Sequence, residues 1–147
     1  MTKLEFSINV PSSADKLIKL AVDYENFRNY LPEQIKSIKI LETNNEETIT
    51  EEILTFSSYI KAEIKQKSIH RKENSNTLST NVVSGPFKGT TLRIIFDAST
   101  SGTKVTVSAN MKIPLKYKIA SLVIKRSYKI FLTGIIYKMN SDVLKSS

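Results

Sequence analysis

Residues 84–114 read SGPFKGTTLRIIFDASTSGTKVTVSANMKIP and predict two adjacent antiparallel strands. After the Gly-Pro-Phe turn, residues 91–96 place apolar side chains at alternating positions, and residues 104–113 repeat this two-residue period. The ASTSG between them has the composition of a turn. Pro114 ends the second strand, because proline cannot donate a hydrogen bond within a sheet. The inward positions are expected to be Leu92, Ile94, Phe96, Val105, Val107, Ala109 and Met111.

Upstream of this segment the chain predicts one strand, two helices and then more strands. Residues 3–10 alternate, and Pro11 stops this strand. Residues 14–22 have the spacing of a helix, and residues 24–30 predict a second short helix that ends before Pro32. The two-residue period then returns, with short turns between strands, which indicates an antiparallel meander. These further strands are expected from residue 38 and over 48–56, 59–70 and 77–83.

A long helix is predicted from residue 115 to about residue 144. Its far side mixes Lys and Arg with Leu122, Leu132 and Ile136, which we expect to be exposed. The apolar faces of the helix and the sheet must be buried together. We therefore predict an α+β fold in a single domain, 1–147. In it a seven-stranded curved antiparallel sheet wraps around the long C-terminal helix, and two short helices follow the first strand. The apolar stripe of the long helix comprises Ala120, Ile124, Tyr128, Phe131, Ile135 and Met139.

A line of small residues at seven-residue spacing also runs along this helix. It comprises Ala120, Ser127, Gly134 and Ser141. A glycine within a helix costs roughly 1 kcal/mol relative to alanine, so Gly134 needs a structural reason. Either the line roofs a cavity above the sheet, or it permits tight packing of the helix on a strand.

The chain resembles a known superfamily over essentially its whole length, and three stretches carry the resemblance: residues 10–42, residues 84–114 and the C-terminal helix. Residues 10–42 (VPSSADKLIKLAVDYENFRNYLPEQIKSIKILE) are similar to the helix-helix entry of the START/Bet v 1-like (SRPBCC, helix-grip) superfamily, and particularly of its polyketide cyclase/coenzyme Q-binding-like group. Residues 84–114 resemble that group's Gly-Pro-Phe turn and the strands after it. The chain departs from the group at Ile94, where Trp is common.

The resemblance implies binding or transport of a hydrophobic small molecule, such as a lipid, a quinone or a polyketide-like compound. The ligand would occupy a cavity between the sheet and the C-terminal helix, lined mostly by aliphatic side chains with a few polar groups. The candidate ligand-binding residues are Phe27, Tyr30, Ile64, Gln66, Ser68, His70, Thr80, Val82, Leu92, Ile94, Val107, Phe131 and Ile135.

Three of these candidates are polar residues on an otherwise apolar strand face. That face begins with Ile60, Ala62 and Ile64 and continues with Gln66, Ser68 and His70. Polar groups that point into an apolar interior need partners, which would be each other, water or a ligand.

The polar positions also leave a cyclase or dehydratase type of enzyme as an alternative, with His70 as its acid or base. We assign no catalytic residue, because no paired carboxylates fall on inward faces. Glu51 and Glu52 are expected to be solvated.

The positive charge of the chain is concentrated at its C-terminal end. The whole chain has 22 Lys and Arg against 14 Asp and Glu, a formal charge of +8. Residues 112–147 contain a single acid, Asp142, and eight basic residues: Lys112, Lys116, Lys118, Lys125, Arg126, Lys129, Lys138 and Lys145. This segment is either a solvated helix face or a docking surface for RNA, a ribosome or an anionic membrane. The docking surface would use Lys118, Lys125, Arg126 and Lys129, and the apolar residues among them would also suit a homodimer contact.

Composition excludes several other classes of function. The chain has no Cys and one His, which rules out disulfides, thiolate metal sites and His–His metal ligation, so we expect no metal and no cofactor. It has no phosphate-binding loop motif and no GxGxxG. Its longest apolar stretch, residues 130–137, is far shorter than the roughly 20 residues that a membrane helix needs. With no signal peptide in its first residues, we expect a cytoplasmic protein.

Overall fold

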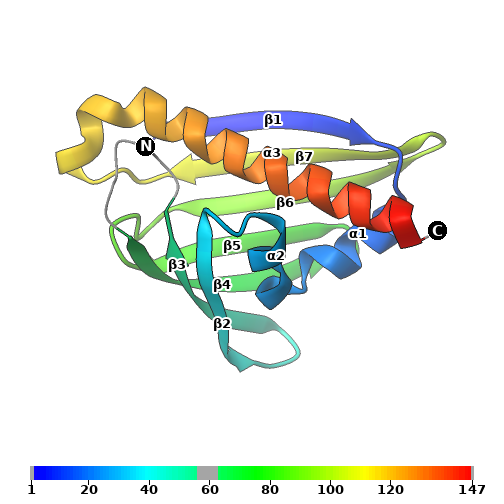
Figure 1. The fold of residues 1–147 in the computed structure, drawn as a ribbon, viewed down its shortest axis with the longest axis horizontal. Coiled ribbons are helices and arrows are strands. Elements are labelled where there is room, and N and C mark those ends of the chain that lie inside the picture. The colour runs from blue at the N-terminus through cyan, green and yellow to red at the C-terminus, as the bar shows by residue number, and fades with distance from the viewer. Residues whose placement is uncertain (1, 56–62, 147) are drawn as a thin grey trace.

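The computed structural model describes residues 2–55 and 63–146 and contains the seven strands and the long C-terminal helix (Figure 1). Two short helices follow the first strand, as predicted. The elements are β1 (Thr2–Val10), α1 (Ala14–Ala21), η1 (Tyr24–Asn26), α2 (Phe27–Tyr30), β2 (Ile35–Thr43), β3 (Glu47–Leu54), β4 (Ile64–Asn74), β5 (Thr77–Ser84), β6 (Thr91–Ser99), β7 (Gly102–Met111), η2 (Leu115–Ala120) and α3 (Ser121–Ser146).

The seven strands form one antiparallel sheet in the order β1-β7-β6-β5-β4-β3-β2. Consecutive strands pair from β2 to β7. The first strand, β1, pairs along its full length with the last strand, β7. Helix α3 lies across one face of this curved sheet, and α1 and α2 lie near its C-terminal half (Figure 1). This arrangement confirms the predicted helix-grip fold.

The core lies between α3 and the inward face of the sheet. Alternating residues of β7 are buried from Thr103 to Met111, and Val105 and Val107 have no exposed surface. Phe96 of β6 and Ile124 of α3 are almost equally inaccessible. The alternating apolar residues of the strands and the apolar stripe of the helix therefore pack against each other, as the sequence predicts.

Two strand boundaries differ from the prediction. The strand predicted over 59–70 is β4, which begins at Ile64 among the described residues and continues to Asn74. Ile60 and Ala62 lie outside the described residues. Residues 72–76 (KENSN) have the composition of a turn, but the turn is shorter than these five residues, because Asn74 still pairs with Thr77 after an irregularity in the register. Composition marks a turn, but the hydrogen-bond register fixes where the strand ends.

Helix α3 buries a wider arc than its sequence pattern predicts. Leu132 is 6% exposed and Ile136 is 2% exposed, so the prediction that they face solvent is wrong. Because α3 contacts α1 and α2 as well as the sheet, a second side of its C-terminal half is covered. Leu122 is exposed, as expected. Within the described parts of the chain, no helix combines the length and hydropathy needed to cross a bilayer.

Gly134 allows a close contact between α3 and the chain that follows α2. A Cβ atom at Gly134 would lie 3.3 Å from a methyl group of Leu31. The small-residue line therefore permits tight packing at this position, against the loop after α2 rather than against a strand. Gly134 does not roof the cavity described below.

Gly102 is predicted to be the least replaceable glycine in the sheet. It has a φ of +143°, and a Cβ there would overlap the carbonyl oxygen of Val10 and the backbone of Pro11. We expect Gly102→Ala to lower the free energy of unfolding by about 1–3 kcal/mol. Urea unfolding followed by circular dichroism measures this change. Gly134→Ala is the control. Its free energy of unfolding is expected to stay within about 1 kcal/mol of the wild-type value, because the added methyl group contacts only the flexible end of the Leu31 side chain. Equal losses in both variants would contradict the assignment.

Candidate functional site

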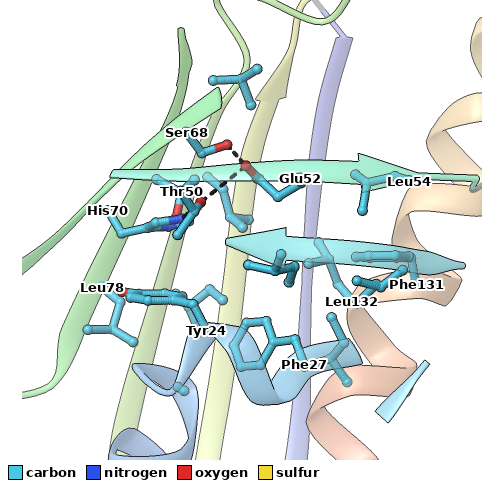
Figure 2. Close-up of a pocket in the computed structure, with 18 of the residues that line it drawn as sticks. Tyr24, Phe27, Thr50, Glu52, Leu54, Ser68, His70, Leu78, Phe131 and Leu132 are labelled. Carbon is cyan, nitrogen blue, oxygen red and sulfur yellow. Dashed lines mark hydrogen bonds between the residues drawn. The ribbon is translucent and has the colours of Figure 1, made fainter. Parts of the chain in front are cut away.

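A cavity of about 140 Å³ lies between α3 and strands β2–β6. Residues of α1, η1 and α2 close one side of it, so the wall combines segments from most of the chain (Figure 2). Its apolar lining comprises Ala21, Phe27, Ile35, Ile38, Leu54, Leu78, Val82, Leu92, Ile94, Phe96, Phe131, Leu132, Ile135, Ile136 and Met139. Its polar lining comprises Tyr24, Thr50, Glu52, Gln66, Ser68, His70, Thr80 and Tyr128.

Most of the predicted ligand-binding residues line this cavity. They are Phe27, Gln66, Ser68, His70, Thr80, Val82, Leu92, Ile94, Phe131 and Ile135. The other three lie elsewhere in the core. Val107 is on β7, whereas the sheet residues of the described lining come from β2–β6; Ile64 is buried at the start of β4. Tyr30 is buried beside Phe27, with ring centroids 6.1 Å apart, and does not reach the cavity.

Glu52 is buried in the cavity wall, so the prediction that it is solvated is wrong. The residue is 8% exposed, and its carboxylate accepts three hydrogen bonds from side chains. Ser68 Oγ donates to Oε1 at 2.6 Å, and Gln66 Nε2 donates to the same oxygen at 3.5 Å. Thr50 Oγ1 donates to Oε2 at 3.1 Å (Figure 2). Neighbouring strands β3 and β4 supply the carboxylate and all three donors.

His70 continues this network toward β5. Its Nε2 lies 2.8 Å from Thr50 Oγ1, and its Nδ1 lies 2.7 Å from Thr80 Oγ1. Because Thr50 donates its proton to Glu52, its oxygen accepts from Nε2–H of His70, and Thr80 then donates to Nδ1. The imidazole also stacks on the Tyr24 ring, with centroids 4.1 Å apart and an interplanar angle of 19°. Glu52, Thr50, His70 and Thr80 thus form one continuous hydrogen-bonded chain.

Burial changes the pKa of every titratable group in this network. It lowers the pKa of His70 from 6.5 to about 4, so the imidazole is neutral at neutral pH. It raises the pKa of the Glu52 carboxyl, and the hydrogen bonds from Ser68, Thr50 and Gln66 only partly oppose this. Burial also raises the pKa of the Tyr24 hydroxyl to about 12. Glu52 is therefore the one group of the described lining that can carry charge near neutral pH.

The sequence pattern does not predict Thr50, Glu52 and Tyr24 as lining residues. Thr50, Glu52 and Leu54 occupy alternate positions of β3 and share its inward face. The alternation is visible in the sequence TITEEILTF, but the opposite face carries Ile49 and Ile53, so the pattern does not tell which face is inside. Tyr24 lies in a single helical turn whose orientation only the packing of η1 determines.

The arrangement can hold a mostly apolar molecule and hydrogen-bond one polar end of it. Among residues 2–55 and 63–146, no group of three His, Asp or Glu side chains is placed to hold a metal ion.

A curved antiparallel sheet that grips one long helix over a lined cavity defines the helix-grip class of proteins. Residues 1–146 match the model of the pathogenesis-related protein Bet v 1 family, and the chain belongs to this family. No curated protein matches the chain in sequence.

Several solved structures have the same fold at low sequence identity. TTHA0849 from Thermus thermophilus is 15% identical with a TM-score of 0.84, and the match covers 99% of each chain. The ZhuI aromatase/cyclase from Streptomyces sp. R1128 is 10% identical with a TM-score of 0.80, over 97% of this chain and 95% of that one. A START superfamily protein from Mycobacterium smegmatis is 14% identical with a TM-score of 0.74, over 99% of each chain. Together with the family match, these structures confirm the superfamily that the sequence resembles.

The lowered pKa of His70 predicts a loss of stability on acidification. Between pH 6.5 and about pH 4 the unfolded chain binds a proton at His70 while the folded chain does not, so stability falls as the pH falls. From about pH 7 to pH 5 this linkage removes about 2 kcal/mol from the free energy of unfolding. Urea unfolding at both pH values should show a loss larger by that amount in wild type than in His70→Gln. The same slope in both proteins would show that His70 is not held neutral.

Proposed function

We propose that this protein binds and carries an apolar small molecule in the cavity between α3 and strands β2–β6. The observation that carries the proposal is the lining itself: a mostly apolar wall with a few polar groups gathered on β3, β4 and β5. Small-molecule sites typically have this composition, in which apolar area supplies affinity and a few polar groups set orientation. A lipid, a quinone or a polyketide-like compound has the matching chemistry.

The energetics favour a ligand in which apolar surface predominates. Each Å² of apolar surface removed from water contributes about 25 cal/mol, and the lining offers aliphatic and aromatic contacts on several sides. The polar network is already hydrogen-bonded within the protein, so it does not require a strongly polar ligand to satisfy it. Membership of the Bet v 1 family supports the proposal, since the superfamily is associated with hydrophobic ligands.

The proposed site predicts that filling the cavity abolishes binding. Ile94 lines the cavity on β6, and its neighbour Ile95 is outside the lining, so Ile94→Trp and Ile95→Trp are a matched pair. We expect wild type and Ile95→Trp to bind the neutral fluorescent probe N-phenyl-1-naphthylamine, and Ile94→Trp to bind it at least about 10-fold more weakly, because the indole occupies ligand space. Fluorescence titration measures this, with circular dichroism to verify folding.

Native mass spectrometry of the purified protein, followed by solvent extraction, would identify any apolar molecule that remains bound. Failure of wild type to bind the probe, together with a mass that shows no ligand, would contradict the proposed function.

A second candidate function is docking on an anionic membrane. The docking surface would lie where the chain leaves β7 and enters η2 and the first turn of α3. We define the η2 tip as Leu115, Ile119 and Leu122, which are 87%, 100% and 77% exposed. Exposed lysines lie among them and next to them, at Lys116 and Lys118. Large apolar side chains exposed beside cations suit a surface that is apolar inside and negatively charged outside, which is an anionic bilayer.

The same tip suits RNA or a second copy of the chain less well. Phosphate contacts need cations and leave fully exposed aliphatic side chains without a role. A symmetric dimer would bring two copies of this strongly basic segment together, and like charges repel. Of the cations named for this surface, Lys129 lies over the Phe6 ring, with its Nζ 5.4 Å from the ring centroid.

The docking hypothesis predicts that one charge at the η2 tip weakens membrane binding. We expect Ile119→Asp to reduce binding to phosphatidylcholine vesicles containing phosphatidylserine by at least about 10-fold, since burying such a side chain contributes roughly 1.5–3 kcal/mol. Leu41→Asp makes the same charge change at an exposed position on β2 and should bind as wild type does. Vesicle sedimentation measures both. Equal binding by the two variants, or binding that ignores phosphatidylserine, would contradict docking.

A further inference from the structure

The cavity differs in charge from the rest of the molecule. The chain has a formal charge of +8, yet no Lys or Arg of the described residues lines the cavity. Its titratable lining groups are Glu52, His70, Tyr24 and Tyr128. His70 is neutral at neutral pH, and burial raises the pKa of both tyrosine hydroxyls, so these three groups carry no charge there. The described lining is therefore neutral when Glu52 is protonated and negative when Glu52 is ionised.

Among the described residues, Glu52 has hydrogen-bond donors around it but no cation. Within residues 2–55 and 63–146, no Lys, Arg or His nitrogen lies within 4.0 Å of its carboxylate. Three side-chain donors converge on the two oxygens, which is the arrangement that stabilises the ionised form. A carboxylate offers about four acceptor positions, so these donors leave room for one more. Because an unpaired buried charge is costly, burial favours the protonated form of Glu52, and a positively charged partner would favour the ionised form.

From this juxtaposition we infer that Glu52 recognises a protonated amine, so that the ligand is an apolar molecule carrying one cationic nitrogen. The inference rests on the proposed function and narrows its ligand class. The amine would donate to the free position of the Glu52 carboxylate while the remainder of the ligand lies against the apolar wall.

The aromatic rings of the lining favour a cationic ligand group for a reason separate from Glu52. Tyr24 and Phe27 meet edge to face with centroids 5.9 Å apart, and Tyr128 and Phe131 stack at 6.5 Å. All four rings line the cavity, and the negative face of an aromatic ring attracts a nearby cation. An anionic ligand group would instead meet a buried carboxyl group, with no Lys or Arg in the described lining to offset it.

Three compounds with one ring system and different charge test the inference by calorimetry. They are 2-naphthylmethylamine, which is cationic, 2-naphthylmethanol, which is neutral, and 2-naphthoate, which is anionic. We expect wild type to bind the amine at least about 10-fold more tightly than the alcohol, since a hydrogen bond to a charged group contributes about 1.5–3 kcal/mol. Binding of 2-naphthoate should be the weakest of the three. This comparison needs no variant, so it does not depend on how a substitution folds.

Substitution then assigns the preference to one carboxylate. Glu52→Gln keeps the size and removes the charge, and it should bind the amine and the alcohol equally. Glu51→Gln is the matched control, because Glu51 is the next residue, does not line the cavity and lies 3.9 Å from Lys65. It should keep the wild-type preference. Equal affinity of wild type for amine and alcohol, or a preference that survives in Glu52→Gln, would overturn the inference and leave apolar binding intact. If no naphthyl compound and no N-phenyl-1-naphthylamine binds, the proposed function fails as well.

Discussion

The structure depends on the packing of one long helix against a curved sheet of seven strands. Helix α3 contacts β1 at one edge of the sheet and α1 and α2 on its other side. A straight helix cannot follow the whole curved surface, so its contacts leave part of the inward face of β2–β6 uncovered. The cavity occupies this space (Figure 2). The same packing that stabilises the fold therefore also creates the proposed binding site.

A cavity wall of this kind tolerates polar side chains only when they have partners. Strands β3, β4 and β5 are adjacent, and their register brings Thr50 opposite Ser68 and His70 opposite Thr80. The sheet thereby holds Glu52 beside its donors and His70 between two threonines. Each of these polar groups is hydrogen-bonded without solvent, which keeps the network ordered.

Charge is distributed in opposite ways inside and outside the molecule. The C-terminal segment from residue 112 is strongly basic, and its Lys116 and Lys118 are exposed among the residues of the η2 tip. The described lining of the cavity instead contains Glu52 and no Lys or Arg. An anionic membrane would attract the tip, whereas the cavity would favour a neutral or cationic ligand group. The two proposals thus use different residues and opposite electrostatics, so each can be tested without the other.

The sequence alone determined the succession of strands, the long helix and ten of the 23 residues in the described cavity lining, because two-residue and helical periods record which side chains must be buried. It did not determine the faces of elements that are apolar on both sides. On β3, Ile49 and Ile53 hid the inward position of Glu52, and on α3 the arc containing Leu132 and Ile136 resembled a solvated face. Only the tertiary structure decided these positions, because burial there depends on contacts between strands and helices far apart in the chain, which no local period encodes.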